Sequence, residues 1–280
     1  MISILRIKSV GFLVLFKLFC ITSFLESCES QCVVFVSNQK YFPRFLESLE
    51  QLVTKGNYHG DICLVIGDDL LSNKLLRHRL LIRNHVIIKH FPDLPFSQVF
   101  LEFAKQAPHP FNEKLFQYHK LYLFDTYFKQ WDTIFYIDSG MKIYRDIQPI
   151  LNAKKQNKLL AHSDAYPSYE WKLGIQFNAN FPEIFSELSR TYNLDIDYFQ
   201  TTTMLYDTNI IQKDTFQNLY NLTLRYPISR TNDQGIIALY FTNIVSVWEQ
   251  LPIRNEETFF YDLIRRGREK ESFIMIKYDF

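Results

Sequence analysis

Short runs of consecutive apolar residues alternate with helical patterns along the first half of the chain. The apolar runs occupy residues 33–36, 62–66, 85–89 and 133–137. Between these runs lie three segments whose apolar residues recur every three to four positions, as on one face of a helix. Two of them begin at residues 45 and 70, and the third covers residues 112–128. A continuous apolar run is typical of a strand buried on both faces. The alternation therefore predicts an α/β fold with a mainly parallel sheet flanked by helices.

The second half of the chain has shorter apolar runs between longer irregular pieces. Its strand candidates are residues 159–161, 202–206 and 244–248. They predict an antiparallel extension, so the sheet as a whole is expected to be mixed. Because no linker rich in Gly, Pro or Ser separates the two halves, we expect a single domain over residues 31–280.

Residues 1–30 have the pattern of an N-terminal targeting segment. Arg6 and Lys8 precede an apolar stretch over residues 10–25, which Lys17 interrupts. This stretch is shorter than the roughly 20 apolar residues of a membrane-spanning helix, which favours a cleaved signal peptide over a signal anchor. A signal peptide and a signal anchor both predict the secretory pathway, that is, the lumen of the endoplasmic reticulum or Golgi, or secretion. A signal anchor would also hold the protein at the membrane through residues 10–25. An apolar helix on a cytosolic protein is the alternative.

Charge and motif content exclude several classes of function. The 280 residues include 31 basic and 30 acidic side chains, a formal net charge of +1, so no charge excess attracts a nucleic acid. The sequence contains no P-loop and no Gly-x-Gly-x-x-Gly fingerprint, which argues against NTPases and dinucleotide-dependent oxidoreductases.

Cys32 and Cys63 begin predicted strands, which favours buried free thiols over a disulfide.

Aromatic residues make up 16% of the chain, and we expect most of them in the core. Residues 166–171 (YPSYEW) are different, because they follow a predicted strand and combine aromatic faces with a carboxylate. Such side chains suit a sugar. We expect this loop to cover a sugar donor or to receive an acceptor.

Polar residues follow three predicted strands at the edge where open α/β sheets bind ligands. They are Ser37, Asn38, Tyr41, Asp69, Asp138 and Ser139. Asp138 comes directly after a strand, and carboxylate oxygens suit a hard divalent cation that carries a diphosphate. Each of the carboxylates also has a structural interpretation. Asp138 would cap the following turn, and Asp69 would cap a helix beginning at Leu70.

Four segments follow one another in a recognisable order. They are residues 34–42 (VFVSNQKYF), the helical segment around Lys120, residues 131–141 (WDTIFYIDSGM) and residues 231–241 (TNDQGIIALYF). Together they resemble the GT-A glycosyltransferases, and most of all the glycogenin-like nucleotide-diphospho-sugar transferases of family 8. The resemblance covers most of residues 31–241 and implies a GT-A-like, Rossmann-like fold.

The resemblance also implies a reaction and a set of site residues. A nucleotide-diphospho-sugar, a UDP-sugar first of all, would give its sugar to a glycan, protein or small-molecule acceptor with retention of configuration. The donor would be bound by Ser37, Asn38, Tyr41, Asp69, Lys120, Asp138 and Ser139. Asp233 and Gln234 would act next to the reacting carbon. The alternative for Asp233 is a helix N-terminal residue favoured by the helix dipole.

Two departures from the family pattern bear on the metal. The resemblance implies Mn²⁺ or Mg²⁺ on Asp138, but Gly140 stands where the family motif Asp-x-Asp has its second carboxylate. The family's late His-x-x-Gly-x-x-Lys-Pro-Trp segment is also missing, with Lys277 as a candidate stand-in for its phosphate-binding lysine. A catalytically degenerate protein that binds nucleotide-sugar or glycan is therefore the alternative. A sugar-phosphate nucleotidyltransferase is disfavoured, because no glycine-rich basic loop follows the first strand.

Overall fold

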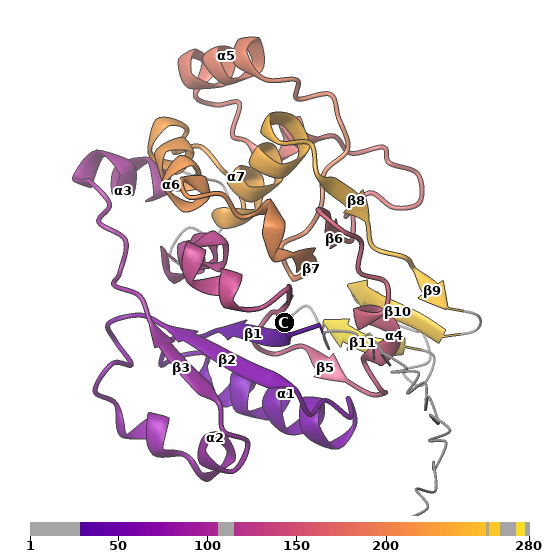
Figure 1. Ribbon diagram of the computed structural model, residues 1–280. Coiled ribbons are helices and arrows are strands. Elements are labelled where there is room, and N and C mark those ends of the chain that lie inside the picture. The colour runs from indigo at the N-terminus through magenta and orange to yellow at the C-terminus, as the bar shows by residue number, and fades with distance from the viewer. Residues whose placement is uncertain (1–28, 106–114, 256–257, 264–272, 278–280) are drawn as a thin grey trace, which may run out of the picture.

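The main sheet contains strands from both halves of the chain. The computed structural model describes residues 29–105, 115–255, 258–263 and 273–277, so residues 1–28 of the predicted targeting segment lie outside it. Within the described residues, seven strands form this sheet in the order β3-β2-β1-β4-β7-β6-β8 (Figure 1). They are β1 (Gln31–Val36), β2 (Asp61–Ile66), β3 (Ile87–His90), β4 (Thr133–Ile137), β6 (Leu159–Ala161), β7 (Thr203–Asp207) and β8 (Trp248–Gln250).

The strand pairing confirms a mixed sheet with a parallel first half. β1 lies between β2 and β4 and is parallel to both, and β2 is parallel to β3. β7 is antiparallel to β4 and to β6. The carboxyl ends of β1, β2 and β4 therefore meet at one edge of the sheet, which is where the sequence places its candidate site residues.

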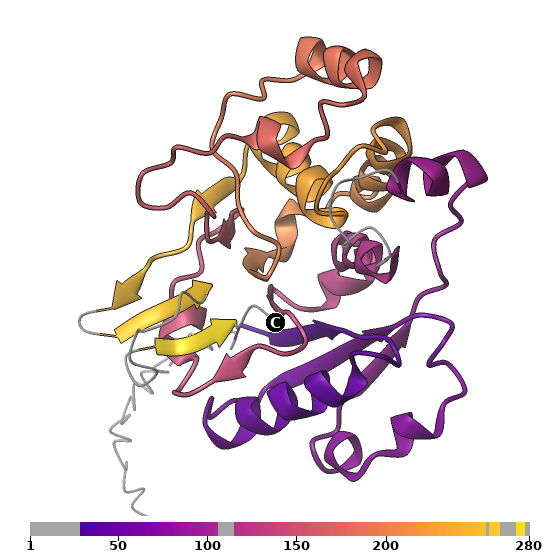
Figure 2. The same cartoon turned by 180° about the vertical axis from the view of Figure 1, so that it is seen from behind.

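Alternate residues of the central strands face two separate hydrophobic cores. Val34 and Tyr136 face one core, and Phe35 and Phe135 face the other. The second core is covered by α1 (Phe42–Thr54), α2 (Arg79–Arg83) and α4 (Gln148–Leu151). The first is covered by the 3₁₀ helix Leu115–Phe124 and by α3 (Gln98–Lys105), α5 (Pro182–Thr191), α6 (Thr215–Arg225) and α7 (Asp233–Leu239). Figure 2 shows from behind that α1 and α2 lie on the opposite side of the sheet from α6 and α7.

A second, smaller sheet joins the loop after β4 to the end of the described chain. Its order is β5-β11-β10-β9, with β5 (Lys142–Ile143), β11 (Phe273–Lys277), β10 (Thr258–Leu263) and β9 (Arg254–Asn255). Ile143, Ile274 and Met275 pack in the same core as α1. Since β5 follows Asp138 by only a few residues, this sheet brings β11 close to the edge of the main sheet.

The predicted helix beginning at Leu70 is wrong. Turns follow β2, and two short helices come after them, the 3₁₀ helix Lys74–Arg77 and α2. Asn73 and His78 have extended backbones, and their side chains accept hydrogen bonds from the next helix's first turn, so each begins a new short helix. Asp69 therefore caps no helix at Leu70.

The predicted long helix over residues 112–128 is present only in part and as a different type. Residues 112–114 lie outside the described chain, and the rest forms 3₁₀ helices at Leu115–Phe124 and Thr126–Gln130. Asp125 separates them because its backbone is extended, and its side chain accepts a 2.8 Å hydrogen bond from the backbone N–H of Tyr127. The remaining short helices are the 3₁₀ helices Leu173–Gln176 and Thr208–Ile210 and the π-helix Tyr240–Ile244.

Two predicted strands begin more than one residue later than expected. The strand predicted at 85–89 begins only at Ile87, because His85 has a φ of 49° and completes a turn after α2. The strand predicted at 244–248 is wrong except for Trp248, since the chain remains helical up to Ile244 before β8 begins.

Cys32 and Cys63 are buried free thiols, as predicted. Burial raises the pKa of Cys63 to about 12, so this thiol is inert at neutral pH.

In the described part of the chain, no helix is both long and apolar enough to cross a membrane.

Candidate functional site

Asp138 is fixed at the carboxyl end of β4 by the strands on both sides. Its backbone N–H donates a 2.9 Å hydrogen bond to the carbonyl of Thr202, just before β7. The next residue, Ser139, donates from its hydroxyl to the carbonyl of Val36 at the end of β1, also at 2.9 Å. The Asp138 side chain is 15% exposed, so it reaches solvent from a nearly buried position.

Three donors bind the Asp138 carboxylate. The Lys120 ammonium lies 3.0 Å from Oδ1, the Tyr136 hydroxyl donates to the same oxygen, and the Lys277 ammonium contacts Oδ2. Burial alone would raise the pKa of Asp138, but the two ammonium groups and the tyrosine outweigh it and hold the pKa well below the usual range. Asp138 is therefore ionised at neutral pH.

Lys120 bridges the two carboxylates of the site. It comes from the 3₁₀ helix Leu115–Phe124 and is 7% exposed. Its ammonium lies 3.0 Å from Asp138 Oδ1 and 3.5 Å from Asp233 Oδ2, and it donates to the carbonyl of Thr201 at 3.4 Å. Burial would lower the pKa of Lys120, but the two carboxylates raise it above the ordinary value, so the ammonium stays charged.

Asp233 lies on the far side of Lys120, at the first position of α7. It is 1% exposed, and its Oδ2 accepts a 2.6 Å hydrogen bond from the Thr201 hydroxyl. Burial raises the pKa of Asp233, while Lys120 and Thr201 oppose that shift. Asp233 therefore occupies the helix N-terminal position that its structural interpretation predicts. It also contacts the ammonium of Lys120 directly.

Gln234 connects this cluster to the segment after β6 and to the 3₁₀ helix Leu173–Gln176. Its Oε1 accepts from the backbone N–H of Thr201 at 3.3 Å. Its Nε2 donates to Asp164 Oδ2 at 3.1 Å and to Gln176 Oε1 at 3.0 Å. Gln234 is thus oriented by residues that come from three separate parts of the chain.

The residues predicted to bind the donor at β1 and β2 form a neighbouring hydrogen-bonded group. Ser37 is fully buried and donates from its hydroxyl to the carbonyl of Asn38 at 3.2 Å. Asn38 Oδ1 accepts from the backbone N–H of Tyr41 at 3.0 Å, and Asp69 Oδ2 accepts from the N–H of Gln39 at 2.8 Å. Asp69 therefore ties the end of β2 to the turn after β1. Ser139 links this group to the Asp138 cluster through β1.

Comparisons with known proteins find similarity of structure only. No protein-family model matches the sequence, and no curated protein matches it either. The galactosyltransferase LgtC, in complex with donor and acceptor sugar analogues, is 13% identical over 82% of this chain and 75% of its own, with a TM-score of 0.54. The mannosyltransferase Ktr4p of S. cerevisiae, in complex with GDP, is 10% identical over 82% of this chain and 71% of its own, with a TM-score of 0.52.

A third solved structure is similar to this chain. Core-mannan synthase A (CmsA/Ktr4) of Aspergillus fumigatus, in its Mn/GDP form, is 10% identical over 79% of this chain and 72% of its own, with a TM-score of 0.50. The similarity of this chain to the three structures extends to its mixed, mostly parallel sheet with flanking helices. The chain has the GT-A fold.

In this GT-A fold, the loop after β4 holds one carboxylate where the family motif has two. Gly140 has a φ of 97°, a conformation that strains any residue with a side chain, and its N–H donates to the Ser48 hydroxyl at 3.0 Å. A divalent cation prefers several oxygen ligands, but both oxygens of Asp138 already carry ammonium groups. Among the described residues, no three His, Cys, Asp or Glu side chains are grouped to hold a metal ion. These side chains do not fit the Mn²⁺ or Mg²⁺ that the resemblance implies.

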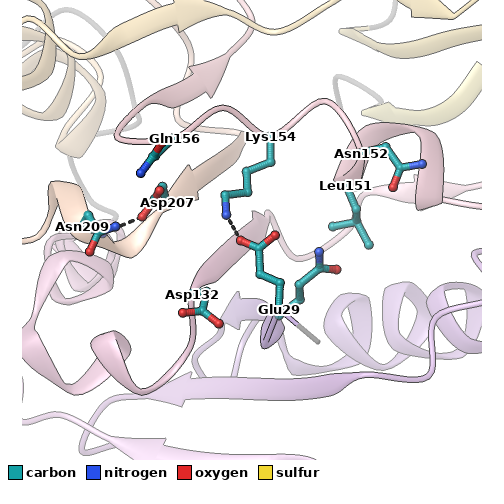
Figure 3. A pocket seen from close by; sticks show the side chains of 9 residues that line it. Glu29, Asp132, Leu151, Asn152, Lys154, Gln156, Asp207 and Asn209 are labelled. Carbon is teal, nitrogen blue, oxygen red and sulfur yellow. Dashed lines mark hydrogen bonds and ion pairs between the residues drawn. The ribbon is translucent and has the colours of Figure 1, made fainter. Parts of the chain in front are cut away.

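A depression of about 780 Å³ lies at the opposite edge of the sheet. It is lined by Gln31 at the start of β1, by Asp132 just before β4 and by Asp207 at the end of the antiparallel β7. Figure 3 shows Lys154 and Glu29 pointing toward each other across it. Asp132 accepts hydrogen bonds from Ser30, and Asp207 caps the helix after β7, so both carboxylates have structural partners. This depression is separate from the Asp138 cluster.

The most important site residue that the sequence did not indicate is Gln176. It ends a 3₁₀ helix in an irregular segment and contacts both Gln234 and Thr231, at 3.0 and 2.6 Å. Thr201 is a second such residue, and it binds both Lys120 and Asp233. Neither residue follows a buried parallel strand, whereas the sequence pattern indicates only polar residues that come directly after such strands.

Proposed function

We propose that this protein is a glycosyltransferase that moves a sugar from a nucleoside-diphosphate donor to an acceptor. The observation that carries the proposal is the cluster at the end of β4, in which buried Lys120 bridges Asp138 and Asp233. The three GT-A neighbours are named as sugar transferases or as a mannan synthase, which supports it. The fold positions this cluster at the sheet edge where α/β proteins bind their ligands.

We place the nucleoside over the ends of β1 and β2. Ser37, Asn38, Tyr41 and Asp69 lie there, within one hydrogen-bonded group. The diphosphate then lies toward Ser139 and Asp138, nearer the middle of the sheet. A UDP-sugar is the first candidate donor, by the resemblance to family 8. A GDP-sugar is the second, since two of the neighbouring structures contain GDP.

The chemistry follows from where charge develops. The acceptor hydroxyl oxygen forms a bond to the anomeric carbon on the face from which the diphosphate departs. The bond to the diphosphate breaks with its electron pair remaining on the phosphate, and the proton of the acceptor hydroxyl passes to the departing phosphate oxygen. A fixed ammonium group near that phosphate stabilises the transition state more than the ground state, which is what accelerates the reaction. Lys120 is already held in place by two carboxylates, so its ammonium needs little reorganisation. Asp233 and Gln234 face the sugar in this arrangement, and retention of configuration is the expected outcome.

The acceptor is proposed to enter beside the aromatic loop at residues 166–171. Tyr166 and Trp171 are 40% and 42% exposed, which is unusual for large aromatic side chains among the described residues. The loop follows Asp164, which accepts a hydrogen bond from Gln234 at 3.1 Å. Aromatic faces next to a site of sugar transfer suit a glycan or another sugar-bearing acceptor.

A catalytically degenerate binding protein is the second candidate. The observation that favours it is the occupation of both Asp138 oxygens by ammonium groups of the chain itself. A protein of this kind would bind the nucleotide-sugar at the same sheet edge without transferring the sugar.

For location, we propose the secretory pathway, with either cleavage or membrane anchoring of the N-terminal segment. The support is the charged and apolar pattern of residues 1–30. Of these, only Glu29 and Ser30 are described by the structure.

A donor screen tests the proposed function. The full chain, purified in mild detergent, is incubated with UDP- and GDP-sugars, and released nucleoside diphosphate is measured with and without a mixture of simple sugar acceptors. We expect release from at least one donor, faster with an acceptor. Nucleotide binding without release from any donor would instead support the degenerate candidate.

A further inference from the structure

Lys277 occupies the side of Asp138 that faces away from Lys120. Its ammonium contacts Oδ2, whereas Lys120 and Tyr136 bind Oδ1. The Lys277 side chain is 28% exposed and that of Lys120 only 8%. Of the two ammonium groups on this carboxylate, Lys277 is therefore the one that a ligand reaches from solvent.

The position of Lys277 is built into the fold rather than left to a mobile side chain. The four preceding residues of β11, Phe273 to Ile276, are at most 2% exposed. β11 pairs antiparallel with β5, with Met275 opposite Ile143. β5 itself directly follows the loop that carries Asp138. A slip of one residue in this pairing would turn Lys277 to the opposite face of β11, away from Asp138, so the register of β11 against β5 fixes where Lys277 points.

The formal charges at this position match those of a metal-bearing site. In the Asp-x-Asp motif a doubly charged cation sits against two carboxylates, and their sum is zero. In this chain the ammonium of Lys120 is balanced by Asp233 and that of Lys277 by the single carboxylate of Asp138, and the sum is again zero. Gly140, with its φ of 97°, replaces the second carboxylate. The loss of one carboxylate and the replacement of the cation by a lysine therefore compensate each other.

We propose that Lys277 takes the place of a divalent cation at this site, and that the diphosphate of the donor is bound by ammonium groups of the chain without a metal ion. The proposal rests on the proposed function, since it assumes a nucleoside-diphosphate ligand. The exposed N–H bonds of Lys277 donate to the phosphate oxygens while Asp138 holds the ammonium in position. A metal ion would have to displace Lys277 from Asp138 before it could bind.

The test is the binding of UDP, GDP, uridine and guanosine to the full chain, measured by calorimetry in EDTA and in Mn²⁺. For the wild type we expect the nucleoside diphosphate to bind with the same affinity in both solutions. In Lys277→Met the affinity for the diphosphate falls roughly 10- to 100-fold, because a charge-assisted hydrogen bond is lost, while the nucleoside binds unchanged. Lys277→Arg retains most of the affinity.

Lys142→Met is the matched control. Lys142 lies on β5, in the same small sheet, and its ammonium contacts Glu47 on α1 instead of Asp138. The substitution removes the same charge and should leave diphosphate affinity unchanged.

Three results would overturn the proposal. Diphosphate binding by the wild type that disappears in EDTA and returns with Mn²⁺ would show a metal site. It would leave the proposed glycosyltransferase function in place, and it can be measured without any variant. Equal losses for nucleoside and diphosphate in Lys277→Met would show an indirect structural effect. If none of the four ligands binds the wild type in either solution, the proposed function fails, and this inference fails with it.

Discussion

At the scale of single residues, the site is organised around one buried positive charge. Lys120 lies between Asp138 and Asp233, and Thr201 completes the set by donating to Asp233. The sequence indicated Asp138, because a buried strand runs directly into it, and Lys120 and Asp233 by family resemblance. It did not indicate Gln176 or Thr201, since their importance depends on contacts between segments distant in sequence.

Replacing Lys120 tests this organisation through stability. Lys120→Met leaves Asp138 and Asp233 close together without the ammonium between them. Removing one partner of a buried ion pair lowers the free energy of unfolding by about 3–5 kcal/mol. We expect the free energy of unfolding in urea to fall by that amount.

Lys129→Met is the control for this experiment. Lys129 lies on the next 3₁₀ helix and donates to the carbonyls of Thr208 and Ile211 instead of to carboxylates. Its loss should cost about 1–3 kcal/mol. Equal losses in the two variants would contradict the assignment of Lys120 as the bridge between the carboxylates.

At the scale of elements, the strands of the parallel half were predictable and the helices near the site were not. β1, β2 and β4 consist mostly of consecutive apolar residues in short runs, and this length is typical of buried strands. The segment around Lys120 forms two 3₁₀ helices instead of one long helix. Its apolar spacing does not reveal this, because the break depends on a local hydrogen bond of the Asp125 side chain.

The placement of α7 gives a prediction at this scale. A Cβ atom added at Gly235 would lie 2.6 Å from Ser229 Oγ and 3.3 Å from the carbonyl oxygen of Gln176. Gly235→Ala should therefore push the first turn of α7 away from Gln176, cost about 1–3 kcal/mol and lower activity, because Gln234 moves with that turn. Thermal unfolding and nucleoside diphosphate release measure the two effects.

Gly174→Ala is the matched control, since its Cβ would lie 3.5 Å from Leu194, at ordinary contact distance. We expect a change in stability within about 0.5 kcal/mol. A Gly235→Ala variant as stable and active as Gly174→Ala would show that the close approach of α7 is unimportant.

At the scale of the whole molecule, the order of elements was readable from the sequence, but the second sheet was not. The mixed α/β sheet follows from the alternating apolar and helical patterns. The second sheet joins the two-residue strand β5 to strands more than a hundred residues later, and no local pattern encodes such a pairing. Yet it is this sheet that brings Lys277 to Asp138.

The central claim is that sugar transfer takes place at the Asp138 cluster, and nucleoside diphosphate release by the wild type and by Asp138→Asn tests it most directly. The asparagine keeps the shape of the side chain and removes the charge that positions both Lys120 and Lys277. The account predicts a folded variant whose release from the best donor is slower by about 100-fold or more, the scale at which single electrostatic groups act in active sites. Equal release by the two folded proteins would contradict it.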